Sequence, residues 1–529
     1  MKKRILLVNE FSGLNTGYAV YGRNLFSELH KTGKYELAEL ACYLDPRDTR
    51  ASQFPWRVYP AIPHPDNQQE TQAYHSDPQN VFGKYAFEKV CLDFKPNIVA
   101  VLRDTWMERF IVDSPFKPYF KWGWLATIDG VPQQPNWLSM YGEVDGLFTY
   151  TDWSKDIIEE YGVKVQGTAS PVADLAFQPV ENKEEFKKQF GFEGLKIVGM
   201  ASRNQARKLY PDLLEVFREV LDKTGRKDLY LYLHCSNHDQ GWNLPELIKQ
   251  NGLSSRVILT YVCKKCGYGF PSVFNDENIR CKRCGQQEAV CSNVQIGLPS
   301  QGLAQIYNLW DICIQWASSE GAGMCPVEAA ACGVPVIEVD YSAMSDVCRK
   351  LNGEVIEPIA YAKEVMTARK MAVPDNKKLI EYLIEFLNLP GMIQRIKGKE
   401  ARDGFEKHYS SWEKTAQVWM NWIDGLPNEN LWGSPPNIKQ IPRFEDIPKE
   451  ISNSEFVKVC MNYVLGERDK LFGFMHLGLL KNLNYGFLPS GNSKQNFGRQ
   501  EVYNVLANIR LRINGWEQER INRCTKQKT

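Results

Sequence analysis

The chain has 529 residues, of which 43% are hydrophobic and 24% are charged, and its formal net charge is +1. This length is too great for a single hydrophobic core, and the composition excludes a disordered or fibrous protein. The N-terminal apolar run is too short for the core of a signal peptide, and no apolar stretch of about 18 residues follows. We therefore expect a cytoplasmic protein without a membrane span.

Strands and helices alternate in the first part of the chain. Residues 3–9 form a short apolar run, which is typical of a buried parallel strand. A loop with Gly13 and Gly17 follows, and apolar residues at helical spacing then predict a helix over residues 18–31. Further strands are predicted at residues 96–102, 123–128 and 146–150. This pattern predicts a Rossmann-like domain over residues 1–180.

A second alternation begins near residue 195. Strands are predicted at residues 196–201, 229–234, 257–262, 312–316 and 334–339, and helices at residues 211–223 and 303–309. The polar segment 178–194 suits a connection between the two blocks. We therefore predict a second Rossmann-like domain over residues 190–425, again with a parallel sheet.

The C-terminal part differs in composition from the two α/β blocks. Five prolines between residues 426 and 448 predict an extended linker, and the pattern of residues 449–529 predicts a small accessory helical domain. Residues 481–529 hold nine Lys or Arg against three Glu, with aromatic residues among them. Such a segment fits either a phosphate backbone or a solvated helix face, and both interpretations stay open.

The segment 319–336 carries the most specific pattern. Gly321 and Gly323 form a loop whose backbone N–H groups can approach a ligand, and a helix is predicted to begin at Pro326. A helix N-terminus that follows glycines is suited to phosphate. Glu320 lies in the loop and Glu328 in the predicted first turn of the helix, so both carboxylates are expected to reach the same bound molecule.

The spacing of Glu320 and Glu328, followed by the sequence AAACGVPV, resembles the E-x7-E signature of retaining GT-B glycosyltransferases, especially those of family 4. The resemblance covers about residues 1–425. It implies an α/β fold in which two Rossmann-like domains face each other across a cleft, with a nucleoside-diphosphate sugar as donor. It also implies that Glu320 contacts hydroxyls of the donor sugar and that Glu328 contacts the ribose.

Two cations follow the first strand of the second block. Arg203 and Lys208 are five residues apart, and similar proteins place an Arg and a Lys at this spacing to hold the donor diphosphate. Breaking the anomeric bond loads negative charge onto the leaving diphosphate, and removing one preorganised group that stabilises such charge costs ~3 kcal/mol. Arg207 is adjacent to Lys208, and the sequence leaves open which of the two cations lies closer.

The first block contributes two weaker matches. Gly17 and Gly13 fit the glycine loop of the family, although the usual Gly-Gly pair is absent. Asp129 occupies the place of the family's His-Asp pair, with Ile128 where the His is expected. Asp129 is therefore predicted either to face the acceptor or to cap a turn. The expected catalytic residues are Glu320, Arg203, Lys208 and Asp129, and the expected donor-binding residues are Gly17, Arg203, Lys208, Gly321, Gly323 and Glu328.

Four cysteines have the spacing of a metal site. Cys263, Cys266, Cys281 and Cys284 form a C-x2-C-x14-C-x2-C pattern, and a glycine follows each pair. Four thiolates at this spacing favour a closed tetrahedral zinc site, with iron as the alternative metal, and such a site is structural rather than catalytic. The sequence therefore predicts a zinc-ribbon insertion over residues 260–292, which carries five Lys or Arg and two acidic residues between its first and last cysteine.

The acceptor is the least specified part of the prediction. The opening GLNTGYAVYGRNL resembles glycosyltransferases encoded by bacteriophages, some of which are similar to enzymes that decorate hydroxymethylated bases in DNA. Together with the ribbon and the basic C-terminal segment, this favours retaining sugar transfer to such a base, in the host cytoplasm. Two alternatives stay open: transfer to a surface glycan, lipid or protein, and a non-enzymatic nucleic-acid-binding protein with a degenerate sugar-binding fold.

Overall fold

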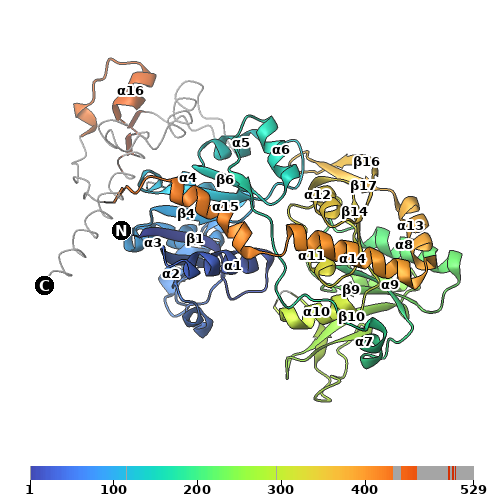
Figure 1. Cartoon of the computed structure of the whole chain (residues 1–529). Coiled ribbons are helices and arrows are strands. Elements are labelled where there is room, and N and C mark those ends of the chain that lie inside the picture. The colour runs from blue at the N-terminus through green and yellow to red at the C-terminus, as the bar shows by residue number, and fades with distance from the viewer. Residues whose placement is uncertain are drawn as a thin grey trace.

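The computed structural model describes residues 2–429 apart from 115 and 294, residues 431–432 and 443–460, and residues 499–500, 503–504 and 507. Two α/β domains lie side by side (Figure 1). Most of the predicted accessory domain 449–529, including the basic segment 481–529, and much of the predicted linker 426–448 lie outside the described residues. Among the described helices, none combines the length and the apolar character needed to cross a membrane.

The first domain is built on a seven-stranded sheet in the order β3-β2-β1-β4-β5-β6-β7, and all of its strands are parallel. The strands are β1 (Lys3–Glu10), β2 (Tyr35–Cys42), β3 (Arg57–Pro60), β4 (Ile98–Val101), β5 (Lys121–Ala126), β6 (Gly146–Thr149) and β7 (Gly167–Thr168). The helices are α1 (Gly17–Lys31), α2 (Gln68–His75), α3 (Lys84–Phe94), α4 (Arg109–Val112), α5 (Pro135–Gly142) and α6 (Asp152–Glu160). Short 3-10 helices are η1 (Thr49–Gln53), η2 (Pro78–Phe82), η3 (Thr105–Met107) and η4 (Lys117–Tyr119).

The second domain holds a sheet in the order β11-β10-β9-β8-β13-β14-β15, with β12 also paired to β10. The strands are β8 (Lys196–Ala201), β9 (Leu229–His234), β10 (Val257–Cys263), β11 (Gly269–Val273), β12 (Ala289–Cys291), β13 (Ile312–Gln315), β14 (Val336–Val339) and β15 (Glu354–Ile356). The helices are α7 (Lys183–Gln189), α8 (Tyr210–Thr224), α9 (Leu244–Gln250), α10 (Ser300–Asn308), α11 (Met324–Ala331), α12 (Ser342–Lys350), α13 (Asn376–Asn388) and α14 (Gly391–His408). Within this sheet only β11 and β12 are antiparallel to their neighbour, so the two largely parallel sheets confirm the predicted α/β class.

Both sheets are buried on two faces. In β1, Ile5 and Leu7 pack with α1, whereas Leu6 and Val8 pack on the opposite side with α3. Strands covered by helices on both faces read as continuous apolar runs, which is why residues 3–9 were recognisable in the sequence.

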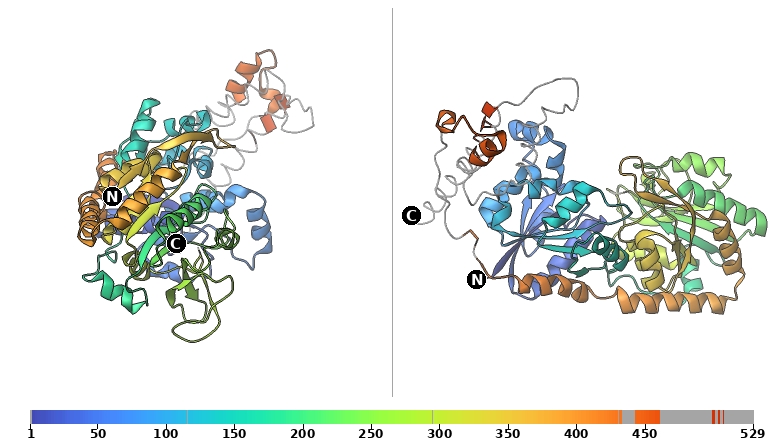
Figure 2. Two further views of the ribbon diagram at one scale, coloured as in Figure 1. Left: turned by 90° about the vertical axis from the view of Figure 1, so that its right-hand side faces the viewer. Right: turned by 90° about the horizontal axis from the view of Figure 1, so that it is seen from above.

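Helix α15 (Trp412–Gly425) returns the chain to the first domain (Figure 2, right). Trp419 stacks on Phe148 of β6 at a centroid distance of 4.2 Å. A Cβ at Gly123 or Gly146 would come within 3.0 Å of the ring of Trp422, so these strand positions accept only glycine. The helix therefore covers one face of the first sheet.

A two-stranded hairpin, β16 (Pro358–Lys363) and β17 (Lys370–Pro374), projects from the second domain toward α5 and α6 of the first (Figure 1). Two further elements follow α15 in the described chain: the 3-10 helix η5 (Phe444–Asp446) and α16 (Asn453–Cys460).

Three local features differ from the sequence expectations. The segment 178–194 contains α7, whose buried Lys187 pairs with Asp311 at 2.7 Å (Nζ–Oδ2). Strand β2 was missed because its sequence YELAELAC contains two glutamates. Helix α11 begins at Met324 rather than at Pro326, because Gly323 at φ +74° already ends the loop and acts as the N-cap.

Candidate active site at the domain boundary

The predicted donor residues lie on two loops that leave neighbouring strands of the second sheet. The loop after β8 carries Arg203 to Lys208, and the loop after β13 carries Glu320. Two backbone hydrogen bonds join the loops: Leu209 N–H donates to the carbonyl of Trp316 (3.1 Å), and Ser318 N–H donates to that of Arg207 (2.9 Å). Ligands of open α/β sheets bind beyond the carboxyl ends of the strands, which is where both loops lie.

Lys208 is hydrogen-bonded to Glu320. The ammonium donates to Oε1 of Glu320, and both residues are buried, with 4% and 8% of their surface exposed. Burial holds the pKa of Lys208 well below its usual value. The Nε of Arg207 lies 3.5 Å from the same carboxylate oxygen, so both adjacent cations face Glu320 and Lys208 is the closer one.

Arg203 is held differently from Lys208. Its Nε donates to Oδ2 of Asp239 at 2.7 Å, and its side chain is 44% exposed. Arg203 also acts electrostatically on Glu10, at the end of β1 in the first domain, although burial raises the pKa of that carboxyl overall. Arg203 therefore lies at the boundary between the domains, but its partner is Asp239 rather than a residue of the loop after β13 that carries Glu320 (the glutamate loop).

Glu328 is the fifth residue of α11 and so lies in its second turn, two residues deeper than expected, because the helix begins at Met324. Its Oε2 accepts a hydrogen bond from the hydroxyl of Tyr307 on α10 at 2.8 Å. Burial raises the pKa of Glu328 to about 7, although the hydrogen bond from Tyr307 opposes the shift. The carboxyl therefore changes its charge near neutral pH.

Two glycines mark close contacts across the domain boundary. A Cβ at Gly321 would come within 3.0 Å of Cγ2 of Thr127, which follows β5 in the first domain. A Cβ at Gly17, the first residue of α1, would lie 3.5 Å from Sδ of Met324, the first residue of α11. The N-termini of α1 and α11 thus come together at the boundary. Thr16 caps α1, whereas α11 has no side-chain cap, so the positive end of the α11 dipole faces this region.

Gly13 has a local role. A Cβ at this position would come within 3.0 Å of the ring of Phe11, so the glycine is required by packing inside its own loop.

Asp129 lies beside the glutamate loop, since its Cβ would be 3.7 Å from a Cβ at Gly321. Its Oδ1 is paired with the guanidinium of Arg369, which precedes β17 of the hairpin. Asp129 therefore faces the second domain, and the structure gives it a cationic partner that no sequence motif indicated.

The sequence analysis also missed a polar cluster on the first domain. The hydroxyl of Tyr18 donates to Oδ1 of Asp104 (2.7 Å) and lies 2.9 Å from Oγ1 of Thr127. Burial lowers the pKa of Arg207, and the charge of Asp104 opposes this effect from across the boundary. A search for polar residues after each parallel strand would have found Asp104, because it follows β4. At the boundary, acidic side chains of the first domain thus lie opposite basic side chains of the second domain.

The four cysteines come together as predicted from their spacing. Their Sγ atoms all lie within 4.8 Å of one another, with 3.6 Å between Cys263 and Cys284 and 3.7 Å between Cys266 and Cys281. Four sulfurs at about 2.3 Å from a tetrahedral zinc ion are about 3.8 Å apart, so the set fits this metal. The following glycines have φ of +68° and +71°, and each donates its N–H to the carbonyl of the first cysteine of its pair.

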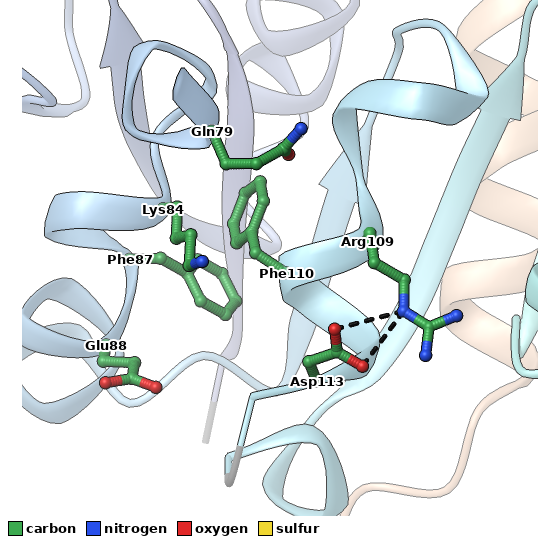
Figure 3. A pocket seen from close by; sticks show the side chains of 7 residues that line it. All are labelled: Gln79, Lys84, Phe87, Glu88, Arg109, Phe110 and Asp113. Atoms are coloured by element: carbon green, nitrogen blue, oxygen red, sulfur yellow. Dashed lines mark hydrogen bonds and ion pairs between the residues drawn. The ribbon is translucent and has the colours of Figure 1, made fainter. Parts of the chain in front are cut away.

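A separate hollow of about 320 Å³ lies in the first domain between α3 and α4 (Figure 3). It is lined by Gln79, Lys84, Phe87, Glu88, Arg109, Phe110 and Asp113. Since none of the predicted donor residues lines it, this hollow is not part of the candidate site.

Comparisons with known proteins agree with this geometry. Residues 286–396, which include Glu320 and Glu328, match the family model described as glycosyl transferases group 1. A comparison with curated proteins gave no match.

Solved structures share the whole two-domain fold. Sucrose-phosphate synthase from Thermosynechococcus elongatus aligns with a TM-score of 0.56 at 15% identity, over 80% of this chain and 100% of that chain. HepE from Anabaena, solved with UDP and glucose, aligns with a TM-score of 0.55 at 12% identity, also over 80% and 100%. A glycosyltransferase from Rickettsia africae gives 0.52 at 14% identity, over 81% and 100%. The fold is therefore GT-B, and with the family match it makes this chain a glycosyltransferase.

Proposed function

We propose that the protein is a retaining glycosyltransferase that transfers a sugar from a nucleoside diphosphate sugar to a hydroxyl group of a hydroxymethylated base in DNA. The observation that carries the donor part is the cluster of Lys208, Arg207 and Glu320 beside the N-terminus of α11. A cation pair next to a helix N-terminus suits a diphosphate, and a carboxylate at the same point suits the hydroxyls of a sugar.

The residues at the boundary divide the reaction between them. Lys208 and Arg207 would exchange Glu320 for the diphosphate and stabilise the charge that develops as the anomeric C–O bond breaks. The acceptor hydroxyl forms the new bond to the anomeric carbon on the same face, and its proton passes to the departing phosphate oxygen. Glu320 would then bind sugar hydroxyls and Glu328 the ribose. HepE from Anabaena was solved with UDP-glucose, which supports a nucleotide-sugar donor here.

The acceptor part rests on charge. Lys264, Lys265, Lys282 and Arg283 stand on the two cysteine turns, and all four side chains are at least partly exposed. Clustered cations of this kind suit a phosphate backbone. The basic segment 481–529 predicted from the sequence adds to this charge, although it lies outside the described residues. The four thiolates would hold a structural Zn²⁺ that fixes these turns.

A donor and acceptor screen tests the proposal. The purified chain is incubated with UDP- and GDP-sugars, each with hydroxymethylated and unmodified DNA, and the mass of the DNA is then measured by mass spectrometry. We expect one donor to add a single sugar mass to hydroxymethylated DNA only. Lys208→Ala should lower the rate by about 100-fold, whereas Lys223→Ala, a control on the exposed face of α8, should leave it unchanged.

The two parts of the proposal fail in different ways. Donor cleavage without any transfer to DNA would refute the acceptor and keep the glycosyltransferase chemistry. Donor cleavage that survives Lys208→Ala unchanged would refute the donor site. Inversion of the anomeric configuration in the product would refute retention.

A further inference from the structure

The hairpin β16–β17 ends in an exposed apolar tip. Val365 is 95% exposed and Met366 is 86% exposed, which makes them the two most exposed large apolar side chains at this end of the molecule. Their loop is ordered by the rest of the tip: Glu364 N–H donates to the carbonyl of Arg369, Ala368 N–H donates to that of Glu364 (both 2.8 Å), and the Glu364 carboxylate accepts from Thr367 N–H at 3.0 Å. The tip therefore presents two adjacent apolar side chains on a fixed turn.

Positive charge surrounds this tip. Lys363 and Lys370 are exposed on the two strands that flank it, whereas the charge of Arg369 is paired with Asp129. The one acidic residue of the tip, Glu364, accepts hydrogen bonds from Thr367, so the two exposed lysines leave the tip with a net positive charge. An apolar point with cations on both sides is complementary to a partner that has an apolar interior and a negatively charged surface.

The hairpin is joined to both halves of the candidate site. Ala372 N–H donates to the carbonyl of Ser318, in the loop that leads to Glu320 (2.8 Å). Toward the first domain, Lys370 N–H donates to the carbonyl of Val131 (2.7 Å), and the amide of Gln134 donates to the carbonyl of Thr367. The hairpin therefore lies at the domain boundary, where Arg369, at the end of the tip loop, pairs with Asp129.

We propose that Val365 and Met366 insert between base pairs of duplex DNA and hold open the gap left by the acceptor base. This inference rests on the DNA acceptor proposed above and adds that the substrate is a duplex. A base inside a duplex must leave the stack before its hydroxymethyl group can reach the anomeric carbon. Proteins that open a base step insert apolar side chains, Met among them, and place cations on the adjoining phosphates.

A membrane is the other partner with an apolar interior and a charged surface, and the size of the tip favours DNA. Val365 and Met366 together offer fewer apolar atoms than a single myristoyl chain, and one such chain gives only marginal, reversible membrane binding. A wedge needs only to fill one opened base step, for which two side chains are sufficient.

The test compares single-stranded with duplex substrate. A hydroxymethylcytosine oligonucleotide is supplied alone, in a matched duplex, and in a duplex with a mismatch at the modified base. Val365→Ser combined with Met366→Ser should lower the rate on the matched duplex by roughly tenfold or more, because the cost of opening the step is no longer offset. The rate on the single strand should not change, and the mismatch should recover part of the loss. The matched control is Ile359→Ser, since Ile359 is 68% exposed on the same hairpin but away from the tip.

Each outcome decides one point. Equal rates of the double variant and the parent on matched duplex, or an equal loss on single strand and duplex, overturn the wedge. Binding of the parent to vesicles of anionic phospholipid that the double variant loses also overturns it, because the tip is then a membrane contact. If the parent transfers sugar to neither DNA form while still cleaving the donor, the proposed acceptor is refuted and the wedge, which requires it, is refuted with it.

Discussion

Gly321 offers a direct test of how the two domains meet. A methyl group added by Gly321→Ala would come within 3.0 Å of Cγ2 of Thr127, a separation that real Cβ atoms essentially never show. Gly321 has no positive φ, so alanine is allowed by its backbone and the conflict comes from the other domain. Forcing an extra methyl group into a packed contact costs about 1–3 kcal/mol, which corresponds to roughly 5- to 150-fold in rate.

The partner residue supplies the rescue. Thr127→Ser removes Cγ2 and keeps the hydroxyl that lies 2.9 Å from the hydroxyl of Tyr18, so this variant alone should be nearly neutral. We expect Gly321→Ala to lose transfer rate and the double variant to regain most of it, measured as initial rates with the donor identified in the screen. Gly323→Ala is the control that Thr127→Ser cannot rescue, because φ at Gly323 is +74°. Equal impairment of the single and double Gly321 variants would refute the domain contact as the cause.

Three further outcomes follow from the buried charges and the cysteines. Because burial raises the pKa of Glu328 to about 7, the folded chain holds an extra proton between pH 4.5 and about 7. The free energy of unfolding should therefore fall as the pH rises through that window, while donor affinity should rise as the carboxylate forms. Glu328→Gln should flatten both pH profiles. A strong chelator, or Cys281→Ser, should remove the zinc, measured as one ion per chain in the parent, and should lower the midpoint of thermal unfolding. An unchanged midpoint in the metal-free protein would contradict a structural role. Asp311→Asn should destabilise by about 3–5 kcal/mol, because it leaves the buried Lys187 ammonium without its carboxylate, whereas Asp222→Asn in the exposed pair on α8 should cost under ~1 kcal/mol in the same denaturant titration.

The elements predicted best from the sequence are those in which the pattern of apolar residues matches the burial of their side chains. Apolar runs such as β1 and β8 are buried on both faces, so their pattern and their environment coincide. Strand β2 was missed because Glu39 is fully buried: its carboxylate accepts from Trp56 Nε1 (3.0 Å) and from Ser12 N–H (2.7 Å). A charge satisfied by residues distant in the sequence gives no local signal.

The candidate site likewise contains residues that local motifs indicated and one that no motif indicated. Lys208 and Glu320 were found from loop motifs, and the structure brings them into contact. Arg369 carries no motif, and it reaches Asp129 only because the hairpin turns back across the boundary. Residues positioned by a projecting hairpin of this kind cannot be predicted from local spacing, since their role depends on where the hairpin folds.

The path of the chain between the domains constrains how they can move. The chain passes from the first domain to the second once and returns once, and the two passages lie side by side: Thr415 Oγ1 donates to the carbonyl of Ser170 (2.9 Å) at one end, and Arg402 Nη1 donates to the carbonyl of Phe177 (3.2 Å) at the other. Two adjacent segments that are joined by hydrogen bonds along one line resist sliding and separation of the domains but permit rotation about that line. We therefore expect any opening of the boundary to be a rotation about the line of residues 170–177 and 402–415, at the edge of the boundary where α14 meets α15.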